Sequence, residues 1–216
     1  MFLKISMFKG LIKSAWKGSG LTVGNDGDGI YLMGSYWSIW LARWEMTNKA
    51  KAAIIELTGG LQSEGTAYRA WKDQENQYEM TELYDPEMYR LDARKFKIGY
   101  KKTGSIMNDL RKDYMVLQDT NNFRCLMVDR FITDMVDLKS REEGEEIPVG
   151  PLGRYDYIKG AAEIFWQNEV CTLKVMPCVP IEETRDAFML DQMEMWDFSE
   201  GKRRKINECD HKIPGK

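Results

Sequence analysis

The sequence predicts an α+β protein in which antiparallel β-hairpins form a sheet with helices packed on one face. Short segments rich in β-branched and aromatic residues are separated by Gly, Asn, Asp and Pro, which is typical of strands joined by tight turns. Segments near both ends of the chain instead repeat their apolar residues every three or four positions, which predicts amphipathic helices. With 216 residues, 43% of them hydrophobic and 30% charged, the chain suits one compact unit in water.

The first helix is predicted over Met1–Lys17, a segment that has four lysines and no acidic residue. Its apolar residues Ile5, Phe8, Ile12 and Trp16 recur at helical spacing. One interpretation is a helix that packs on the core and keeps its lysines in solvent. The alternative is a helix that lies on a membrane surface or in the groove of a partner, and the sequence leaves both open.

A hairpin turn is predicted within Leu21–Gly29, because Asn, Asp and Gly tolerate the positive φ angles of tight turns. The same residues resemble the start of a calcium loop, but the terminal bidentate Glu is absent, so the turn is favoured. The next segment, Ile30–Met46, holds three of the seven tryptophans and only two charged residues. Because buried aromatic side chains dominate core energetics, we expect Ile30–Met46 to form the central core.

Thr47 is a suitable N-cap for a helix over Lys49–Leu57, and Gly59 is suited to end that helix. The segment Thr66–Met88 is acidic and rich in Tyr, and its pattern predicts a helix followed by a loop before Pro86. Because Tyr and Trp are enriched at protein interfaces, this segment is a candidate contact surface. The alternative, which is favoured, is that these aromatic side chains are half-buried helix residues that cover the sheet.

Ala93–Lys102 alternates basic and apolar residues and is predicted to be an amphipathic outer strand. Ser140–Gly153 combines four Glu with Pro and Gly, so a loop or linker is expected there. Ala161–Trp166 and Val170–Met176 are predicted to form a second hairpin. Ile181–Glu200, with seven acidic residues and one base, is predicted to be a helix that docks through a Met/Trp stripe. The stripe consists of Met189, Gln192, Met193 and Trp196.

Shifting the sequence by 94 positions lays Leu21–Ala42 over Met115–Val136 without a gap. Both segments contain a strand, a polar turn and a second strand followed by an apolar stretch. The chain is therefore built from two related halves, or two hairpins resemble each other by chance, and the sequence leaves both open.

Four regions are expected within one compact unit. They are an α+β core, an acidic Pro/Gly loop or linker, a hairpin followed by the acidic helix, and a basic polar tail. These regions span residues 1–139, 140–153, 154–200 and 201–216, respectively.

Nothing in the sequence indicates an enzyme. The single histidine, His211, lies in the C-terminal tail, and no phosphate-binding, zinc-protease or serine-hydrolase motif occurs. Hydrolysis by carboxylates alone stays open, because it needs only two or three acidic side chains in a cleft. A zinc site is the one metal centre the residues suggest, but its spacing differs from that of zinc ribbons, so no metal or cofactor is expected. Its candidate ligands are Cys171, Cys178, Cys209 and His211.

The expected location is the cytoplasm. The four cysteines are scattered, which is typical of reduced thiols. No segment has the length of a membrane span or the pattern of a secretion signal.

The sequence favours a non-enzymatic protein-binding module. The absence of catalytic motifs and the alternating blocks of charge suit an inhibitor or accessory protein, of the kind that phages and mobile elements encode, that docks on a larger nucleic-acid-processing machine. The residues expected to bind this protein partner are Tyr78, Tyr84, Glu182, Glu183, Asp191, Glu194 and Trp196. The alternative is a nucleic-acid-binding module whose predicted basic strand and 202–205 cluster contact phosphates. Its candidate residues are Arg94, Lys95, Lys97, Lys101, Lys102, Arg203 and Arg204.

Overall fold

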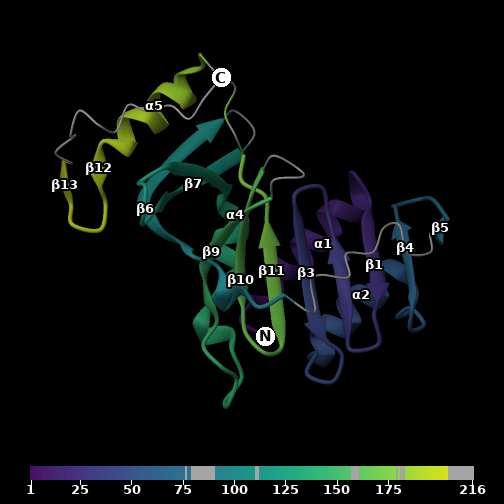
Figure 1. The fold of residues 1–216 in the computed structure, drawn as a ribbon. Coiled ribbons are helices and arrows are strands. Elements are labelled where there is room, and N and C mark those ends of the chain that lie inside the picture. The colour runs from purple at the N-terminus through teal and green to yellow at the C-terminus, as the bar shows by residue number, and fades with distance from the viewer. Residues whose placement is uncertain are drawn as a thin grey trace.

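A large antiparallel sheet organises the protein (Figure 1). The computed structural model describes residues 1–75, 77–78, 91–109, 112–156, 161–178, 180 and 183–203. Within these residues, eleven strands form the sheet, and neighbouring strands are antiparallel throughout. In spatial order the strands are β5 (Gln77–Tyr78), β4 (Thr66–Ala70), β1 (Leu21–Asn25), β2 (Gly29–Met33), β3 (Trp37–Ala42), β11 (Cys171–Val175), β10 (Ala161–Gln167), β9 (Val149–Asp156), β6 (Ile98–Asp109), β7 (Lys112–Asp119) and β8 (Cys125–Asp129).

The N-terminal and C-terminal parts of the chain meet at the centre of this sheet, where β3 pairs with β11. Ile39 lies opposite Leu173, and Leu41 lies opposite Cys171. These four side chains are all buried. The two parts of the chain therefore share one continuous sheet and one hydrophobic core.

Three helices, α1 (Ile5–Lys17), α2 (Asn48–Thr58) and α4 (Arg130–Met135), cover one face of the sheet (Figure 1). The main hydrophobic cluster joins their buried side chains to those of the strands. In α1 the buried residues are Phe8, Leu11, Ile12 and Ala15. This confirms the predicted amphipathic helix and its packing on the core. The helix begins at Ile5 and not at Met1, because Leu3 instead forms a β-bridge with Val136.

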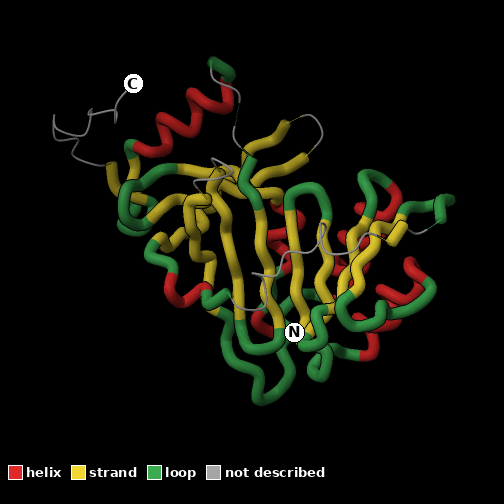
Figure 2. Tube along the Cα trace, turned by 45° about the vertical axis from the view of Figure 1, so that its right-hand side comes forward, coloured by secondary structure: helices red, strands yellow, loops and turns green. Residues whose placement is uncertain are grey.

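The fourth helix, α5 (Arg185–Glu194), packs on the opposite face of the sheet. Successive side chains of a strand point to opposite faces. Accordingly, Leu117 belongs to the main cluster, whereas its neighbour Val116 packs with Leu190 of α5. Figure 2 shows α5 apart from the other helices. The α+β prediction is confirmed, but the expectation that all helices lie on one face is wrong for α5.

The remaining described elements are short. Two 3₁₀ turns, η1 (Ala93–Lys95) and η2 (Leu138–Ser140), precede β6 and β9. A two-stranded hairpin of β12 (Trp196–Asp197) and β13 (Lys202–Arg203) follows α5.

The predicted core segment Ile30–Met46 supplies most of β2 and all of β3. The side chains of β3 that join the main cluster are Trp37, Ile39 and Leu41. Trp40 points to the other face, where it is half-buried. Trp44 lies beyond the end of β3 and is 79% exposed, because none of the described elements covers the turn that leads to α2. The core prediction is therefore confirmed for the strands and wrong for Trp44.

Local turn and cap chemistry matches the sequence. The Asn25 side-chain oxygen accepts a hydrogen bond from the Gly27 N–H, and the Asp26 carboxylate accepts one from the Gly29 N–H. These two hydrogen bonds close the β1–β2 turn. Thr47 Oγ1 accepts from the Ala50 N–H at 3.2 Å and caps α2. The helix ends at Gly59, whose φ of 76° suits a residue without a side chain.

The predicted helix over Thr66–Met88 is wrong at its start, where Thr66–Ala70 forms β4 and pairs with β1. Pairing along five residues of β1 overrides the local helical pattern. Tyr68 is buried, and its hydroxyl donates to the Thr58 carbonyl oxygen at 3.0 Å. Apart from β5 and residues up to 75, the rest of the segment lies outside the described residues.

Two other boundaries differ from the prediction. The strand expected over Ala93–Lys102 begins only at Ile98, because residues 93–95 form η1 under the Asp92 cap. The expectation of an outer strand is wrong, since β6 pairs with β9 on one side and β7 on the other. The loop expected over Ser140–Gly153 gives way to β9 at Val149, which pairs with β10 and β6. The hairpin of β10 and β11 is as predicted.

The two segments related by the 94-residue shift form hairpins with the same register. Thr22 pairs with Met33 in the first, and Val116 pairs with Met127 in the second, which is the same pair moved by 94 positions. The elements that follow differ, since β3 follows the first hairpin and α4 follows the second. The matching register is what two related halves require, and the duplication stays a prediction.

Trp40 anchors the β1–β2 turn to β3. Its Nε1 donates to Asp26 Oδ2 at 2.8 Å, and a Cβ at Gly29 would lie 2.3 Å from its ring. We expect Trp40→Ala to lower the free energy of unfolding by about 2–3 kcal/mol, since it removes both the packed ring and this hydrogen bond. Urea unfolding measures the change. The matched control, Trp44→Ala, should change it by less than about 0.5 kcal/mol, and an equal effect of the two variants would contradict the assignment.

Candidate functional site

The helix α5 is held against β7 and β8 by apolar packing. Leu190 is buried, and Met193 is half-buried beside the same cluster. The strand residues of that cluster are Met107, Val116, Cys125 and Met127. Thr184 Oγ1 accepts from the Ala187 N–H at 3.3 Å and caps the start of the helix.

Polar contacts fix the far end of α5 and the residues after it. Glu194 Oε1 accepts from the Cys125 N–H at 2.9 Å. The Gln118 side chain donates to the Trp196 carbonyl oxygen at 2.7 Å and accepts from the Phe198 N–H at 3.1 Å. Burial raises the pKa of the Cys125 thiol to about 12, with the Glu194 carboxylate acting in the same direction, so the thiol is neutral and packs as an apolar group.

The outer side of this region exposes large apolar side chains. Phe188 is 64% exposed, Met189 38% and Trp196 45%. A hollow of about 330 Å³ lies beside them. It is lined by Met189, Gln192, Met193, Trp196 and Phe198. Together, Phe188, Met189, Met193, Trp196 and Phe198 are called the α5 surface below.

The predicted docking stripe is therefore only partly correct. Met193 packs toward the strands, but Leu190, which was not in the stripe, is the residue that is buried. Met189 of α5 is 38% exposed, and Trp196 is exposed because α5 ends at Glu194 and Trp196 lies in β12, off the helical repeat.

Carboxylates surround the α5 surface. Among described residues 183–200, six side chains are acidic and Arg185 is the single base. Glu183 and Asp191 are exposed and make no ion pair within the described part of the chain. Hydrogen bonds from Ser199 lower the pKa of Asp197, so this carboxylate is charged as well.

The structure brings together four of the residues predicted to bind a protein. Three of them lie exposed on or beside α5, namely Glu183, Asp191 and Trp196. The fourth, Glu194, accepts a hydrogen bond from the Cys125 N–H through its carboxylate. Tyr84 and Glu182 lie outside the described residues. Tyr78 belongs to β5, at the far edge of the sheet from α5, so it is not part of the same surface.

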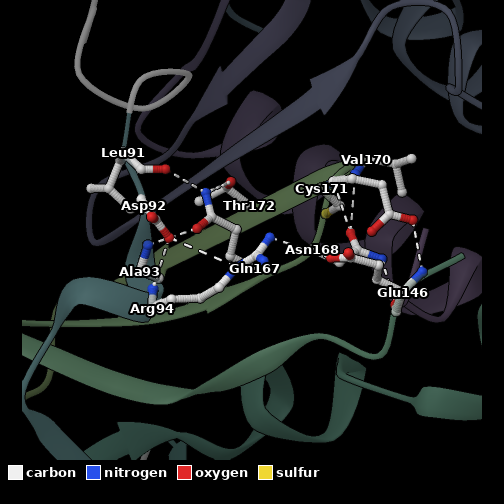
Figure 3. A network of polar contacts seen from close by, with 11 residues as sticks. Leu91, Asp92, Ala93, Arg94, Glu146, Gln167, Asn168, Val170, Cys171 and Thr172 are labelled. Atoms are coloured by element: carbon white, nitrogen blue, oxygen red, sulfur yellow. Dashed lines mark hydrogen bonds and ion pairs between the residues drawn. The ribbon is translucent and has the colours of Figure 1, made fainter.

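The residues predicted to bind nucleic acid do not form one surface. Figure 3 shows Arg94 beside Asp92 and Glu146, and its Nη2 lies 3.3 Å from Glu146 Oε2. Lys95 Nζ lies 3.8 Å from Asp92 Oδ2. The same close-up shows Gln167 binding the backbone of Leu91 and Ala93, which fixes this segment to β10. These two cations therefore already have carboxylate partners.

The other predicted cations point in different directions. Lys97 is exposed just before β6. Lys101 and Lys102 are neighbours in β6, so their side chains lie on opposite faces. Lys102 Nζ donates to the Thr133 carbonyl oxygen at 3.3 Å on the side of α4, whereas Lys101 lies near enough to Asp197 to lower its pKa. Arg203 lies in β13, and Arg204 falls outside the described residues.

Unpaired positive charge is found instead on α1. Lys9, Lys13 and Lys17 are exposed at intervals of four residues, so they form one row along the helix. None of them makes an ion pair with another described residue. The sequence indicated this row, because the predicted N-terminal helix contains four lysines and no acidic residue.

A cleft that no sequence motif indicated lies between α1 and α4. Its volume is about 710 Å³. Its apolar lining consists of Met7, Leu11 and Phe131, and its polar lining includes Tyr36, Lys112, Asp113, Asp129, Arg130 and Asp134. Gly10 of α1 faces Phe131, since a Cβ at Gly10 would lie 3.4 Å from the Phe131 ring.

Three of the cleft residues form a closed hydrogen-bonded network. Lys112 Nζ lies 2.6 Å from Tyr36 Oη and 3.1 Å from Asp129 Oδ2, and Tyr36 Oη donates to Asp129 Oδ2 at 2.8 Å. Burial raises the pKa of Tyr36. Partial burial opposes the charge on Lys112, but its hydrogen bonds with Tyr36 and Asp129 outweigh this and raise its pKa. Both groups therefore keep their protons at neutral pH, and neither serves as a general base there.

The remaining charges of the cleft are also paired. Arg130 Nε lies 3.2 Å from Asp134 Oδ2, and Arg130 Nη1 lies 3.4 Å from Asp113 Oδ2. Asn108 donates to the other oxygen of Asp113 at 2.7 Å. The polar residues that line the cleft are therefore held by hydrogen bonds and ion pairs with one another, and the apolar residues Met7, Leu11 and Phe131 complete the lining.

The zinc hypothesis finds no support in the described residues. Cys171 is buried, and burial raises the pKa of its thiol, which disfavours the thiolate that zinc requires. Cys178 is exposed, and Cys209 and His211 lie outside the described residues. Across the described ranges, no three His, Cys, Asp or Glu side chains are placed to hold a metal ion. In the same ranges, no helix has both the length and the apolar character needed to cross a membrane.

Comparison with known proteins leaves the family open. No family model matches the chain, and no curated protein matches it. Among solved structures, the chain is similar to the beta subunit from DNA polymerase of Streptococcus pyogenes, with 11% identity and a TM-score of 0.29. The match covers 85% of this chain and 66% of that subunit, so the chain spans about two thirds of the subunit's length. A TM-score this low does not establish a shared fold and carries no inference about function.

The network of Tyr36, Lys112 and Asp129 predicts a dependence of stability on alkaline pH. The pKa values of Tyr36 and Lys112 are raised on folding, so their stabilisation is complete below their unfolded pKa values near 10 and is lost as pH rises through the folded values. We expect the stability advantage of the wild type over Tyr36→Phe to shrink above about pH 10. Urea unfolding at a series of pH values measures this.

The control for this experiment is Tyr155→Phe, which alters an exposed tyrosine of β9. The difference in free energy of unfolding between Tyr155→Phe and the wild type should not shrink above about pH 10. A constant difference between the wild type and Tyr36→Phe from neutral to alkaline pH would show that the network does not contribute.

Proposed function

We propose that this protein is a non-enzymatic binding module that docks on a protein partner through the α5 surface. A fitting role is that of an inhibitor or accessory protein, of phage or mobile-element type, acting on a larger nucleic-acid-processing machine. The observation that carries the proposal is the group of exposed apolar side chains formed by Phe188 and Met189 of α5 and Trp196 of β12, beside a helix that is itself firmly packed. Exposed apolar patches of this kind mark interaction sites.

The composition and rigidity of the α5 surface support this role. Trp and Met are enriched at protein interfaces, and Trp frequently contributes most of the binding energy. Packing of Leu190, together with the hydrogen bonds of Gln118 and Glu194, holds the surface in place before any partner binds. Less conformational entropy is then lost on binding.

We propose nucleic-acid binding as a second candidate function, located on α1 and not on the predicted strand. The supporting observation is the row of Lys9, Lys13 and Lys17, which is exposed and has no acidic partner among the described residues. The row is about 12 Å long, given a rise of about 1.5 Å per residue. Neighbouring lysines of the row are about 6 Å apart along the helix, so the row can contact several phosphates of a nucleic-acid backbone.

The exposed side of α1 suits phosphates better than lipid. Its other exposed residues are small or polar, namely Ser6, Gly10 and Ser14. A helix that lies on a membrane needs an exposed apolar face, and the apolar face of α1 is buried in the core.

Removal of Trp196 tests the first function. We expect wild-type protein, used as bait in the lysate of its native cell, to retain a protein that Trp196→Ala loses by at least about tenfold, because a central aromatic anchor contributes 2 kcal/mol or more. Quantitative mass spectrometry of the captured proteins measures this. Trp44→Ala, which removes a still more exposed tryptophan elsewhere, serves as control and should capture the same protein as wild type. A set of captured proteins that does not change with Trp196 would refute the proposal.

Charge removal on α1 tests the second function. We expect the wild type to bind a short double-stranded DNA with a salt slope that falls by about 2–3 when Lys9, Lys13 and Lys17 are replaced by Gln, because each phosphate contact contributes about 0.9. Fluorescence anisotropy across salt concentrations measures the slope. The matched variant Lys95→Gln/Lys97→Gln/Lys101→Gln loses the same charge from the predicted strand. A larger effect of that variant would place the binding there and not on α1.

A further inference from the structure

The kind of partner that fits the α5 surface follows from its size, shape and charge, and this inference rests on the proposed protein-binding function. The exposed apolar residues run from Phe188 to Trp196. From Phe188 to the end of α5 at Glu194 the helix covers about 9 Å, and Trp196 of β12 extends the surface beyond that end. A surface of this length matches about two to three turns of a helix laid along it, which is the usual mode for helix-in-groove recognition.

Two hollows flank α5, and they differ in chemistry. The hollow of about 330 Å³ is mainly apolar, with Met189, Met193 and Trp196 in its wall. The other, of about 320 Å³, is lined by two acidic residues, Asp191 and Glu194, and by one base, Arg124. An occupant that follows α5 therefore meets apolar side chains on one flank and a polar hollow with more carboxylates than cations on the other.

Methionine and tryptophan suit an occupant with apolar anchor side chains. The unbranched Met189 and Met193 side chains adapt to the shape of an incoming group. Trp196 is 45% exposed while its backbone is held by Gln118, so its ring forms a fixed wall. Apolar side chains of the occupant gain most by entering this hollow.

The charge of the region excludes several other occupants. Within the described residues 183–203, six acidic residues stand against three bases, two of which lie in β13 beside β12, and the net negative charge disfavours nucleic acid, anionic lipid and acidic peptides. Self-association of two α5 surfaces would place the same carboxylates against each other. The basic helix α1 of a second copy has the right charge, but its apolar residues are buried in its own core and supply no anchors.

We propose that the α5 surface binds a basic amphipathic segment of a protein partner, about two to three helical turns long. Its apolar side chains contact Met189, Met193 and Trp196. Its Lys or Arg side chains face the carboxylates of Glu183 and Asp191. Apolar contacts supply the affinity in this arrangement, and charge selects the partner and speeds association.

Two designed peptides test the proposal. Both have about 14 residues and the same leucines at helical spacing, with lysine at the polar positions of one and glutamate at those of the other. We expect the lysine peptide to bind the full-length protein at least about tenfold more tightly than the glutamate peptide, because like charges repel at the surface. Isothermal titration calorimetry measures both affinities. The affinity of the lysine peptide should fall as the salt concentration rises, because salt screens the charges.

Variants locate the peptide on α5. Trp196→Ala should lower the affinity of the protein for the lysine peptide at least about tenfold. Glu183→Gln and Asp191→Asn keep side-chain shape and should each weaken it about threefold, the range of exposed ion pairs. Trp44→Ala should leave the affinity unchanged, and thermal unfolding establishes that every variant is folded.

The outcomes separate this inference from the proposed function. The inference of a basic amphipathic partner is overturned if the two peptides bind equally well. It is also overturned if Glu183→Gln and Asp191→Asn do not change the affinity for the lysine peptide. If lysate capture still depends on Trp196 in that case, the protein-binding function stands and the partner has another chemistry. If capture does not depend on Trp196, the function itself fails.

Discussion

The pairing of β3 with β11 is the contact on which the rest of the structure depends. It joins strands that lie more than a hundred residues apart in the chain, and its buried pairs, such as Ile39 with Leu173, lie at the centre of the sheet. Once these strands pair, β1, β2 and β4 extend the sheet on one side, while β10, β9, β6, β7 and β8 extend it on the other. The helices α1 and α4, which come from different parts of the chain, are then brought onto the same face.

This arrangement separates the charges of the protein in space. The row of lysines on α1 lies on the face that carries α2 and α4, whereas the acidic α5 region lies on the opposite face beside β7 and β8. A polyanion and a basic peptide would therefore approach different sides of the sheet. The two proposed surfaces do not compete for the same space, so each can be disrupted by substitution without altering the other.

Sequence reasoning succeeded where the local pattern and the tertiary environment require the same residues. The apolar spacing of Phe8 and Ile12 predicts a helix that the core then buries. Thr47 and Gly59 bound α2 because capping depends on neighbouring backbone groups. The β1–β2 turn forms for the same local reason. The failures are non-local: Thr66–Ala70 becomes a strand only because β1 offers it a partner.

The candidate sites divide in the same way. The acidic, Met- and Trp-containing segment around Trp196 was identified from composition, but which of its side chains face outward depends on where α5 ends and on contacts from Gln118. Arg94 looked available for phosphate, yet the fold places Asp92 and Glu146 beside it. The network of Tyr36, Lys112 and Asp129 had no signal at all, because its members are far apart in the chain and belong to no motif.

Sequence patterns were sufficient to predict the α+β class, the helix α2 with its ends, the helix α1 with its C-terminal end, the β1–β2 and β10–β11 hairpins, and the alternation of basic and acidic segments. These follow from periodicity, turn chemistry and composition, which act over a few neighbouring residues. Only the tertiary structure decided the strand order, the placement of α5 on the opposite face, the pairing of individual charges and the position of the cleft. Each of these depends on contacts between residues distant in the chain, whose free energy is gained only after the sheet has assembled.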